Sequence, residues 1–299
     1  MSSVPGEGDR ERGLALLVEG GGLRGAFSAG VLAELAKPGG PRIDDVVAVS
    51  SAAPTTAYMA AGQVEDGIRI WECYTHGSQL ISPANWLSLS PLMAIDRLVE
   101  VFRHTVVLHA ERAAASPMRT WVAVTNCHSG EIEYVRVTST NVFSLLQATM
   151  AIPLAYGKVV DVEGTPYVDG GVKNPVPIQH TLSMVRDRAV AILTQPRGYR
   201  RRKNPILARL MAASYAKYPA LKPALLDRWR AANESLATIE RLEDEGKLTV
   251  IRPIGPLPAG RLSRSQKDIV ATIEAGRKAA RAFLGQAEPP SDAMPPWGV

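Results

Sequence analysis

Two points at which an apolar run gives way to a helical pattern dominate the first part of the chain. The run Leu14 to Val18 meets three consecutive glycines, and an amphipathic helix pattern begins directly after them. The run Val46 to Val49 stops at Ser50, where a second helix pattern, rich in small residues, begins. Strands that lead directly into helices are typical of α/β proteins, so the sequence predicts an α/β fold.

Each of these two connections carries residues suited to acyl transfer. Gly20, Gly21 and Gly22 leave bare backbone N–H groups at a helix N-terminus, where an oxyanion is stabilised. Ser50 lies on the turn between strand and helix, a position that exposes a hydroxyl for nucleophilic attack. Ser51 is expected to begin the helix, and its backbone N–H is a candidate second oxyanion donor.

The glycine loop also matches the dinucleotide-binding pattern G-x-G-x-x-G through Gly20, Gly22 and Gly25. That pattern needs an acidic residue at the end of the second strand, about 20 residues on, to bind a ribose. Here Asp44 and Asp45 precede the second apolar run, and no Lys-Ser/Thr pair follows the glycines as a phosphate-binding loop requires. The oxyanion interpretation is therefore favoured over a nucleotide site, although a tight turn belongs to both.

The serine elbow departs from the usual G-x-S-x-G, because Ala48 and Ala52 replace its two glycines. Each alanine adds a methyl group where strand and helix approach closely. A nucleophile displaced by about 1 Å can lose on the order of a hundredfold in rate. On the elbow alone, Ser50 is better explained as an N-cap of the following helix. The glycine loop and a later aspartate favour the catalytic interpretation.

That aspartate is Asp169, at the end of the second arm of a hairpin expected over 159–162 and 166–168. Asp-Gly-Gly by itself is typical of a turn. As a partner of Ser50, Asp169 would accept the serine proton and return a proton to the leaving group. An aspartate has an unperturbed pKa of about 3.9, so it needs burial beside the serine to become a useful base.

A Ser-Asp-His triad of the α/β-hydrolase kind is the alternative hydrolase arrangement. His180 follows Asp169, so the order is formally met. However, His180 falls at an expected helix start near Ile178, close in sequence to the acid, and the remaining histidines precede Asp169. An ordinary surface histidine is the better interpretation of His180.

The remaining periodicity predicts further elements. Helices are expected over 64–74, 92–103, 143–150, 178 onward, 206 onward, 227–246 and 265–284, and strands over 120–126, 131–137, 189–193 and 248–252. With 299 residues and no internal repeat, we expect one domain over 13–285, helical in its C-terminal part from about 204. We expect flexible tails over 1–12 and 286–299.

Three segments together resemble the bacterial patatin-like phospholipase family: Gly20-Gly21-Gly22-Leu23-Arg24-Gly25, Val49-Ser50-Ser51 and Asp169-Gly170-Gly171. The resemblance is densest over 14–63 and 144–180 and extends more weakly to about Leu284. It implies a three-layer α/β/α sandwich with a mostly parallel central sheet.

The resemblance further implies a lipid acyl hydrolase, of the phospholipase A or esterase kind, that forms a serine acyl-enzyme through a Ser50–Asp169 dyad. No metal or cofactor is implied. The other implied site residues are the oxyanion residues Gly20, Gly21, Gly22, Leu23, Arg24, Gly25 and Ser51 and the substrate-pocket residues Pro153, Gly170 and Gly171. Arg24 fits either a contact with an anionic headgroup or a solvated first-turn position.

A protein that keeps this fold only to bind lipid or a partner is the hypothesis from another class. Its argument is the altered elbow, Ala48 and Ala52, which would weaken or abolish activity. The intact glycine loop and Asp169 argue against it, because a protein without catalysis has no need to keep oxyanion and base features together.

The segment Arg197–Lys203 has five basic residues in seven and leads into an amphipathic pattern. It suits contact with an anionic membrane surface, and equally a solvated basic loop beside a packed helix. No recognised nucleic-acid motif accompanies the charges, so we expect no nucleic-acid partner despite the net charge of +5. The sequence gives no indication of oligomeric state.

Three observations bear on location. The first twelve residues lack the basic-then-apolar order of a signal peptide. No uninterrupted apolar stretch reaches about 18 residues, so we expect membrane contact to be peripheral. The two cysteines, Cys73 and Cys127, have no metal-ligand spacing, and we interpret them as reduced core thiols of a cytoplasmic protein.

Overall fold

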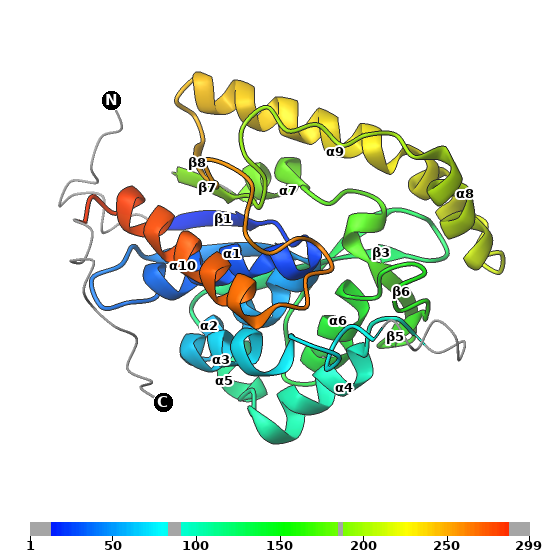
Figure 1. Cartoon of the computed structure of the whole chain (residues 1–299), viewed down its shortest axis with the longest axis horizontal. Coiled ribbons are helices and arrows are strands. Elements are labelled where there is room, and N and C mark those ends of the chain that lie inside the picture. Colours follow the sequence, from blue (N-terminus) through cyan, green and yellow to red (C-terminus); the bar gives the residue numbers. More distant parts are fainter. Residues whose placement is uncertain (1–12, 83–90, 185–187, 287–299) are drawn as a thin grey trace.

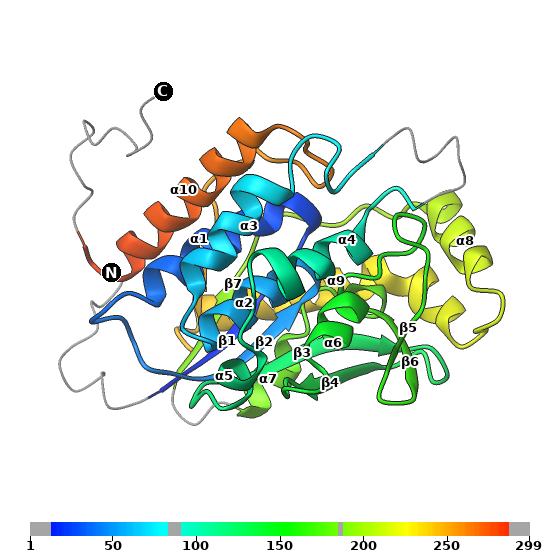
Figure 2. The same ribbon diagram turned by 90° about the horizontal axis from the view of Figure 1, so that it is seen from below.

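The computed structural model describes residues 13–82, 91–184 and 188–286. Within these residues an eight-stranded sheet has the order β5-β6-β3-β2-β1-β7-β8, with β4 beside β3. Its strands are labelled between Figure 1 and Figure 2. The mutually parallel strands are β1 (Leu14–Val18), β2 (Ile43–Val49), β3 (Arg119–Asn126), β7 (Arg188–Ile192) and β8 (Thr249–Ile251). The antiparallel strands are β4 (Ile132–Arg136), β5 (Val160–Val162) and β6 (Thr165–Asp169).

Alternation along β1 divides the core between the two faces of the sheet. Leu16 and Val18 belong to one buried cluster and Leu17 to another, because successive strand side chains point to opposite faces. The first face is covered by α1 (Gly25–Leu35), α2 (Ala53–Ala60), α3 (Val64–Tyr74), α4 (Ile95–Glu100), α5 (Ala110–Ala114), α6 (Val142–Thr149) and α10 (Gln266–Phe283). Figure 2 views the sheet from the side of these helices.

The second face is covered by α7 (Ile178–Met184) and α9 (Leu221–Asp244), which lie above the sheet in Figure 1. A third cluster joins α8 (Pro205–Ser214) and the start of α9 to the end of the sheet at β6, where Met211 packs with Val168. The expected three-layer sandwich with a mostly parallel sheet is therefore confirmed.

The expectation that α1 is amphipathic is wrong, because every residue of this helix is buried. It lies between the sheet and α10, and two glycines permit a close crossing. A Cβ built on Gly30 would lie 2.0 Å from the Ile273 carbonyl oxygen, and one on Gly276 would lie 2.0 Å from that of Phe27. The buried Glu34 carboxylate at the end of α1 accepts from Lys37 and Arg281.

The cysteines are both free. Cys127 is buried as expected, but Cys73 lies on the outer side of α3 and is exposed, so the prediction of a core thiol is wrong there. The flexible tails were expected over 1–12 and 286–299. Apart from residue 286, both lie outside the described residues. None of the helices that the structure describes has both the length and the apolar character needed to span a bilayer.

Candidate active site

The turn after β2 holds Ser50 in a strained conformation. Val49 is extended, with φ −123° and ψ 132°, and Ser50 then has φ 56°, in the left-handed region that non-glycine residues rarely adopt. The Ser50 N–H donates to Thr149 Oγ1 at 2.9 Å, and that hydroxyl donates to the Ala123 carbonyl at 2.7 Å. Strain of this kind persists only where surrounding contacts hold it, and it concentrates at functional sites.

Ser50 and Asp169 meet directly. Ser50 Oγ donates to Asp169 Oδ2 at 2.7 Å, although the two residues are 119 positions apart in the sequence. The register of the sheet explains the encounter, because Val49 pairs with Ala123 on β3 and Asp169 pairs with the next residue of the same strand, Val124. Both residues are buried, Ser50 at 7% and Asp169 at 2% relative exposure.

The second oxygen of Asp169 is also occupied. Oδ1 accepts from the Gly171 N–H at 2.7 Å, and Thr125 Oγ1 donates to the Asp169 carbonyl at 3.0 Å. Burial raises the pKa of Asp169 above its ordinary value, against the opposing effects of the Ser50 hydrogen bond, the Arg228 charge and the Gly171 N–H. A carboxylate with a raised pKa is a stronger base than an exposed aspartate.

The glycine loop lies against the serine turn. A Cβ built on Gly20 would lie 2.4 Å from the Val49 carbonyl oxygen and 2.9 Å from Ser50 Cβ, so only glycine fits there. Gly21 and Gly22 have φ 144° and 63°. The N–H groups of Gly21, Gly22 and Ser51 have no acceptor among the described residues, and Gly21 and Gly22 line the same cleft as Ser50. These N–H groups are free to receive an oxyanion.

The structure gives other roles to the rest of the loop. The Leu23 N–H donates to the Arg261 carbonyl at 3.1 Å, and the Gly25 N–H donates within its own turn, so neither is free to receive an oxyanion. Gly25 instead gives room to Ser51, whose Oγ would lie 2.5 Å from a Cβ at that position. Leu23 and Gly25 belong to the predicted oxyanion segment, but their own N–H groups are already used and are not available as donors.

The Arg24 side chain lies over Gly21 of the glycine loop. When the Gln195 side-chain amide is oriented with its oxygen toward Arg24, that oxygen accepts from the guanidinium. Arg24 Nη2 lies 3.4 Å from the position of a Cβ on Gly21. Burial and the nearby Arg261 charge lower the pKa of Arg24. Arg24 is half-buried and held by Gln195, so it is not a solvated first-turn residue.

A cleft of about 700 Å³ opens over the dyad, and an apolar cavity of about 40 Å³ lies behind it. The cavity is bounded by Ser50 and Ser51 and continues among α2, α3 and α4. Its larger apolar side chains are Leu23, Tyr58, Ile70, Trp71, Leu98, Phe102 and Met150. The space behind Ser50 is therefore lined by groups that suit a hydrocarbon chain.

Pro153 and Gly171, two of the three predicted substrate-pocket residues, line the cleft. Gly170 does not. A Cβ built on Gly170 would lie 2.4 Å from the Ala123 carbonyl oxygen, so this glycine permits the chain to pass closely over β3. Its role is in packing rather than in contact with a substrate.

His180 makes its contacts away from Ser50 and Asp169. Its ring stacks on Tyr134 of β4, with centroids 3.5 Å apart and planes 5° from parallel, against the α7 side of the sheet. No histidine hydrogen-bonds to Ser50 or Asp169 within the described part of the chain. The described residues also hold no group of three or more His, Cys, Asp or Glu side chains that could bind a metal ion.

The altered elbow has a local explanation. Ala52 has φ −78° and ψ −28°, in the right-handed region that alanine adopts without strain. Ala48 and Ala52 are both buried. The close contact with the serine turn is made by Gly20 of the glycine loop, and not by a glycine in the elbow itself. The two methyl groups are therefore accommodated.

Sequence reasoning missed several residues around the dyad. Thr149 fixes the Ser50 backbone, and Thr194 donates from N and Oγ1 to the Glu19 carboxylate at 2.8 and 3.1 Å beneath the glycine loop. Arg228 and Arg261 line the cleft from the C-terminal third of the chain. No motif indicates these positions, because only the tertiary fold brings them to the site.

Comparison with known protein families identifies the family of this chain. The patatin-like phospholipase family model matches residues 16–182, more than half of the chain. The chain belongs to this family. A second family model, for a domain of unknown function (DUF6363), matches residues 218–288 of this patatin-like chain.

Two individual proteins are similar to this patatin-like chain. The uncharacterised protein YjjU of Escherichia coli K12 is 27% identical over 186 residues, which are 61% of this chain and 52% of that protein. The chain thus spans about half the length of this curated relative. The crystal structure of VipD from Legionella pneumophila has a TM-score of 0.48 and 14% identity, covering 92% of this chain and 67% of that one.

Proposed function

We propose that this patatin-like protein hydrolyses acyl esters of lipids through Ser50 and Asp169. The observation that carries the proposal is the 2.7 Å hydrogen bond from Ser50 Oγ to a buried carboxylate of raised pKa. Ser50 Oγ would attack the ester carbonyl carbon while its proton passes to Asp169. The oxyanion formed would accept hydrogen bonds from the N–H groups of Gly21, Gly22 and Ser51.

The second half of the reaction uses the same groups. The leaving alcohol takes the proton from Asp169 as the C–O bond breaks, and the acyl group stays on Ser50. Asp169 then accepts a proton from water, whose oxygen attacks the acyl carbon, and the proton returns to Ser50 as the fatty acid leaves. The apolar cavity behind Ser50 would hold the first carbons of the acyl chain during both steps.

Labelling with a fluorophosphonate is expected to modify Ser50, at a rate that falls as the pH is lowered. Attack by Ser50 needs ionised Asp169, and burial raises the pKa of that carboxyl. A base with a raised pKa is protonated, and so lost, at a higher pH than an exposed aspartate. The acid limb of the labelling rate should therefore lie at a higher pH than the ordinary pKa of an aspartate. Peptide mass spectrometry would identify the modified serine.

An adduct on Ser51, or no adduct on folded protein at any pH, would contradict the dyad. The second outcome would favour the alternative, a weakened or inactive family member that binds lipid or a partner. The structure gives that alternative little support at the elbow, because Ala52 is unstrained and Ser50 keeps its contact with Asp169.

We also propose that the cleft opens onto a membrane surface. Leucines that line its mouth are exposed: Leu154, Leu207, Leu210 and Leu262. Arg202, Lys203 and Arg209 are exposed beside the α8 leucines. An apolar rim with basic neighbours suits an anionic bilayer. A cytoplasmic location stays a prediction from the sequence.

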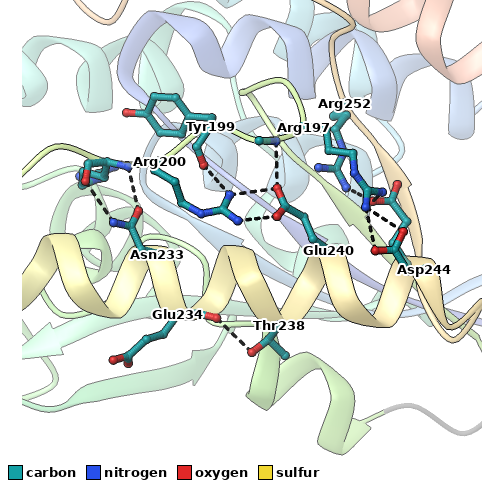
Figure 3. A network of polar contacts seen from close by, with 12 residues as sticks. Arg197, Tyr199, Arg200, Asn233, Glu234, Thr238, Glu240, Asp244 and Arg252 are labelled. Carbon is teal, nitrogen blue, oxygen red and sulfur yellow. Dashed lines mark hydrogen bonds and ion pairs between the residues drawn. The ribbon is translucent and has the colours of Figure 1, made fainter.

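The basic segment Arg197–Lys203 divides into two parts. Arg197 binds Glu243 and Asp244, and Arg200 binds Glu240, so both are paired along α9 (Figure 3). Arg202 and Lys203 are exposed, and Lys203 Nζ lies 5.8 Å from the Trp229 ring centroid. The membrane contact that we propose therefore uses the second part of the segment together with α8.

The double substitution Leu207→Ser/Leu210→Ser should reduce hydrolysis of vesicles of phosphatidylcholine and phosphatidylglycerol by about thirtyfold, because each leucine buried in a bilayer contributes on the order of 1 kcal/mol. The loss should be much smaller for p-nitrophenyl butyrate, which needs no membrane. Ile254→Ser is the matched control, since Ile254 is fully exposed but lines no part of the cleft. Equal losses on vesicles and on the soluble ester would contradict a role at the membrane.

A further inference from the structure

Three arginines that the proposed chemistry does not use meet beside the dyad. Arg201 lies in the loop after β7, Arg228 lies on α9, and Arg261 lies in the loop between β8 and α10. All three line the catalytic cleft, and all three also line an adjoining hollow of about 650 Å³. Because they come from three separate segments, their convergence is a property of the fold.

One of these arginines is hydrogen-bonded to a catalytic loop, and a second lies against the other. The Arg261 carbonyl accepts the Leu23 N–H at 3.1 Å, which ties its loop to the oxyanion glycines. Arg228 Nη2 lies 3.3 Å from the position of a Cβ on Gly171, whose N–H holds Asp169. The arginine cluster therefore reaches both the oxyanion loop and the turn that carries the base.

The carboxylates of Asp169 and Glu19 act on the cluster through their charges, but no described carboxylate forms an ion pair with it. Within the described residues, none of the three arginines lies at ion-pair distance from a carboxylate, in contrast to Arg197 and Arg200 nearby. Arg228 Nε is buried without an acceptor. The nearest carboxylates are already used, Asp169 by Ser50 and Gly171 and Glu19 by Thr194.

Several unpaired cations close together in a partly buried region are unfavourable. In agreement with this, the pKa values of two of these arginines are lowered. Burial, together with the Arg201 and Arg261 charges, lowers the pKa of Arg228 to about 9. Burial and the Arg261 charge lower the pKa of Arg201 to about 10. A bound anion would relieve this repulsion, and guanidinium groups match the oxygens of a phosphate in pairs of hydrogen bonds.

We propose that Arg201, Arg228 and Arg261 bind the phosphate group of the substrate's headgroup, in a part of the cleft that is separate from the apolar cavity. This inference rests on the acyl-hydrolase function proposed above. It gives a role to the C-terminal segment 218–288, which matches a domain of unknown function and supplies two of the three arginines. An ester with a phosphate on its alcohol side would place the first carbons of its acyl chain in the cavity and its phosphate on the arginines.

The test compares two esters that differ in the phosphate: 1-oleoyl-lysophosphatidylglycerol and 1-oleoylglycerol, each in micelles of a neutral detergent. Oleate release gives kcat/KM for each, and the wild-type ratio is the reference. Arg201→Gln and Arg261→Gln should each lower the ratio of the phosphate ester to the neutral ester by about tenfold, as loss of a charge-assisted contact predicts.

Arg197→Gln and Arg230→Gln are the matched controls, because both are exposed and paired with carboxylates and neither lines the cleft. They should keep the wild-type ratio. An unchanged ratio in both test variants would overturn the proposal. An equal fall in the controls would overturn it as well, because net charge alone would then explain the preference.

A binding measurement separates this inference from the proposed function. Calorimetry on Ser50→Ala protein would compare a water-soluble lysophosphatidylglycerol with a hexanoyl chain against inorganic phosphate. We expect the lysophospholipid to bind at least about tenfold more tightly, and Arg261→Gln to weaken it. Equal affinities would assign the site to free phosphate and overturn the headgroup assignment. If fluorophosphonate labelling fails, the proposed function fails, and this measurement still decides whether the arginines bind phosphate.

Discussion

Replacing Ser50 by alanine or by glycine is expected to abolish hydrolysis in both variants but to separate them in stability. Neither variant has the attacking oxygen, so hydrolysis of p-nitrophenyl butyrate should fall by about 10⁴-fold or more. At φ 56° alanine keeps the backbone strain of Ser50, whereas glycine adopts this conformation freely. The glycine variant should therefore have the larger free energy of unfolding, by about 1 kcal/mol, which is a melting temperature about 2 °C higher.

Ser51 offers the matched pair for this comparison. It is the second residue of the helical turn Ser50–Ala52 and does not have a positive φ. There the order should reverse, with Ser51→Ala more stable than Ser51→Gly, because glycine gains no relief and loses more entropy on folding. Hydrolysis that survives in both Ser50 variants, or that is lost in Ser51→Ala, would contradict the assignment of the nucleophile.

The sequence was sufficient for most of the architecture, because the elements of this chain depend on local patterns. The apolar runs at Leu14–Val18 and Val46–Val49 lie in neighbouring parallel strands. The strands expected over 120–126 and 131–137 pair with each other, and the hairpin expected over 159–162 and 166–168 formed. The helix expected over 92–103 is α4, which begins at Ile95 and continues as a π-helical turn over Val101–Thr105. Boundaries differed by a few residues where caps and tertiary contacts decide the ends.

The prediction of an amphipathic α1 was wrong because the burial of this helix depends on packing between distant segments. The pattern after the glycine loop suggested an amphipathic helix, but α10 covers the side of α1 that would otherwise face water. The glycines that permit this crossing, Gly30 and Gly276, are 246 positions apart in the sequence. Neither glycine indicates the contact by itself, so the burial of α1 could not be predicted from its own residues.

In the candidate site, too, some residues could be predicted from local motifs, whereas others depend on tertiary packing. Ser50 and Asp169 were selected by motif, and their proximity came from family resemblance rather than from spacing. The register of β2, β3 and β6 supplies the physical reason for that proximity. Arg228 and Arg261 gave no sequence signal, because an arginine in a charged helix or loop is normally solvated. Their placement depends on how α9 and the loop before α10 pack on the cleft.

The elbow shows why a departure from a motif needs a structure to interpret. Glycine is preferred at such an elbow for two reasons, a left-handed backbone and room for a close neighbour. Here Ala52 is right-handed, and the left-handed position is Ser50 itself. The need for room is met by Gly20 on the facing loop. In this chain, therefore, glycine is needed at Gly20 of the glycine loop and not at the elbow.

This argument makes Gly20→Ala the substitution with the second large expected effect. The new methyl group would lie 2.4 Å from the Val49 carbonyl oxygen and 2.9 Å from Ser50 Cβ, so the glycine loop and the serine turn must separate. A shift of about 1 Å between nucleophile and oxyanion donors should reduce kcat for p-nitrophenyl butyrate by about a hundredfold. Overpacking of this kind should also lower the free energy of unfolding by about 1–3 kcal/mol.

Two controls make the result specific. Gly255→Ala places a methyl group where nothing lies within 4 Å and should change neither kcat nor the melting temperature measurably. Ala52→Gly restores the usual elbow residue, and because Ala52 is unstrained it should not raise kcat. A Gly20→Ala enzyme with wild-type kcat, or an Ala52→Gly enzyme with much higher kcat, would show that the glycine requirement still lies at the elbow. The combination expected here would show that the close contact from Gly20 sets the position of Ser50 relative to its oxyanion donors.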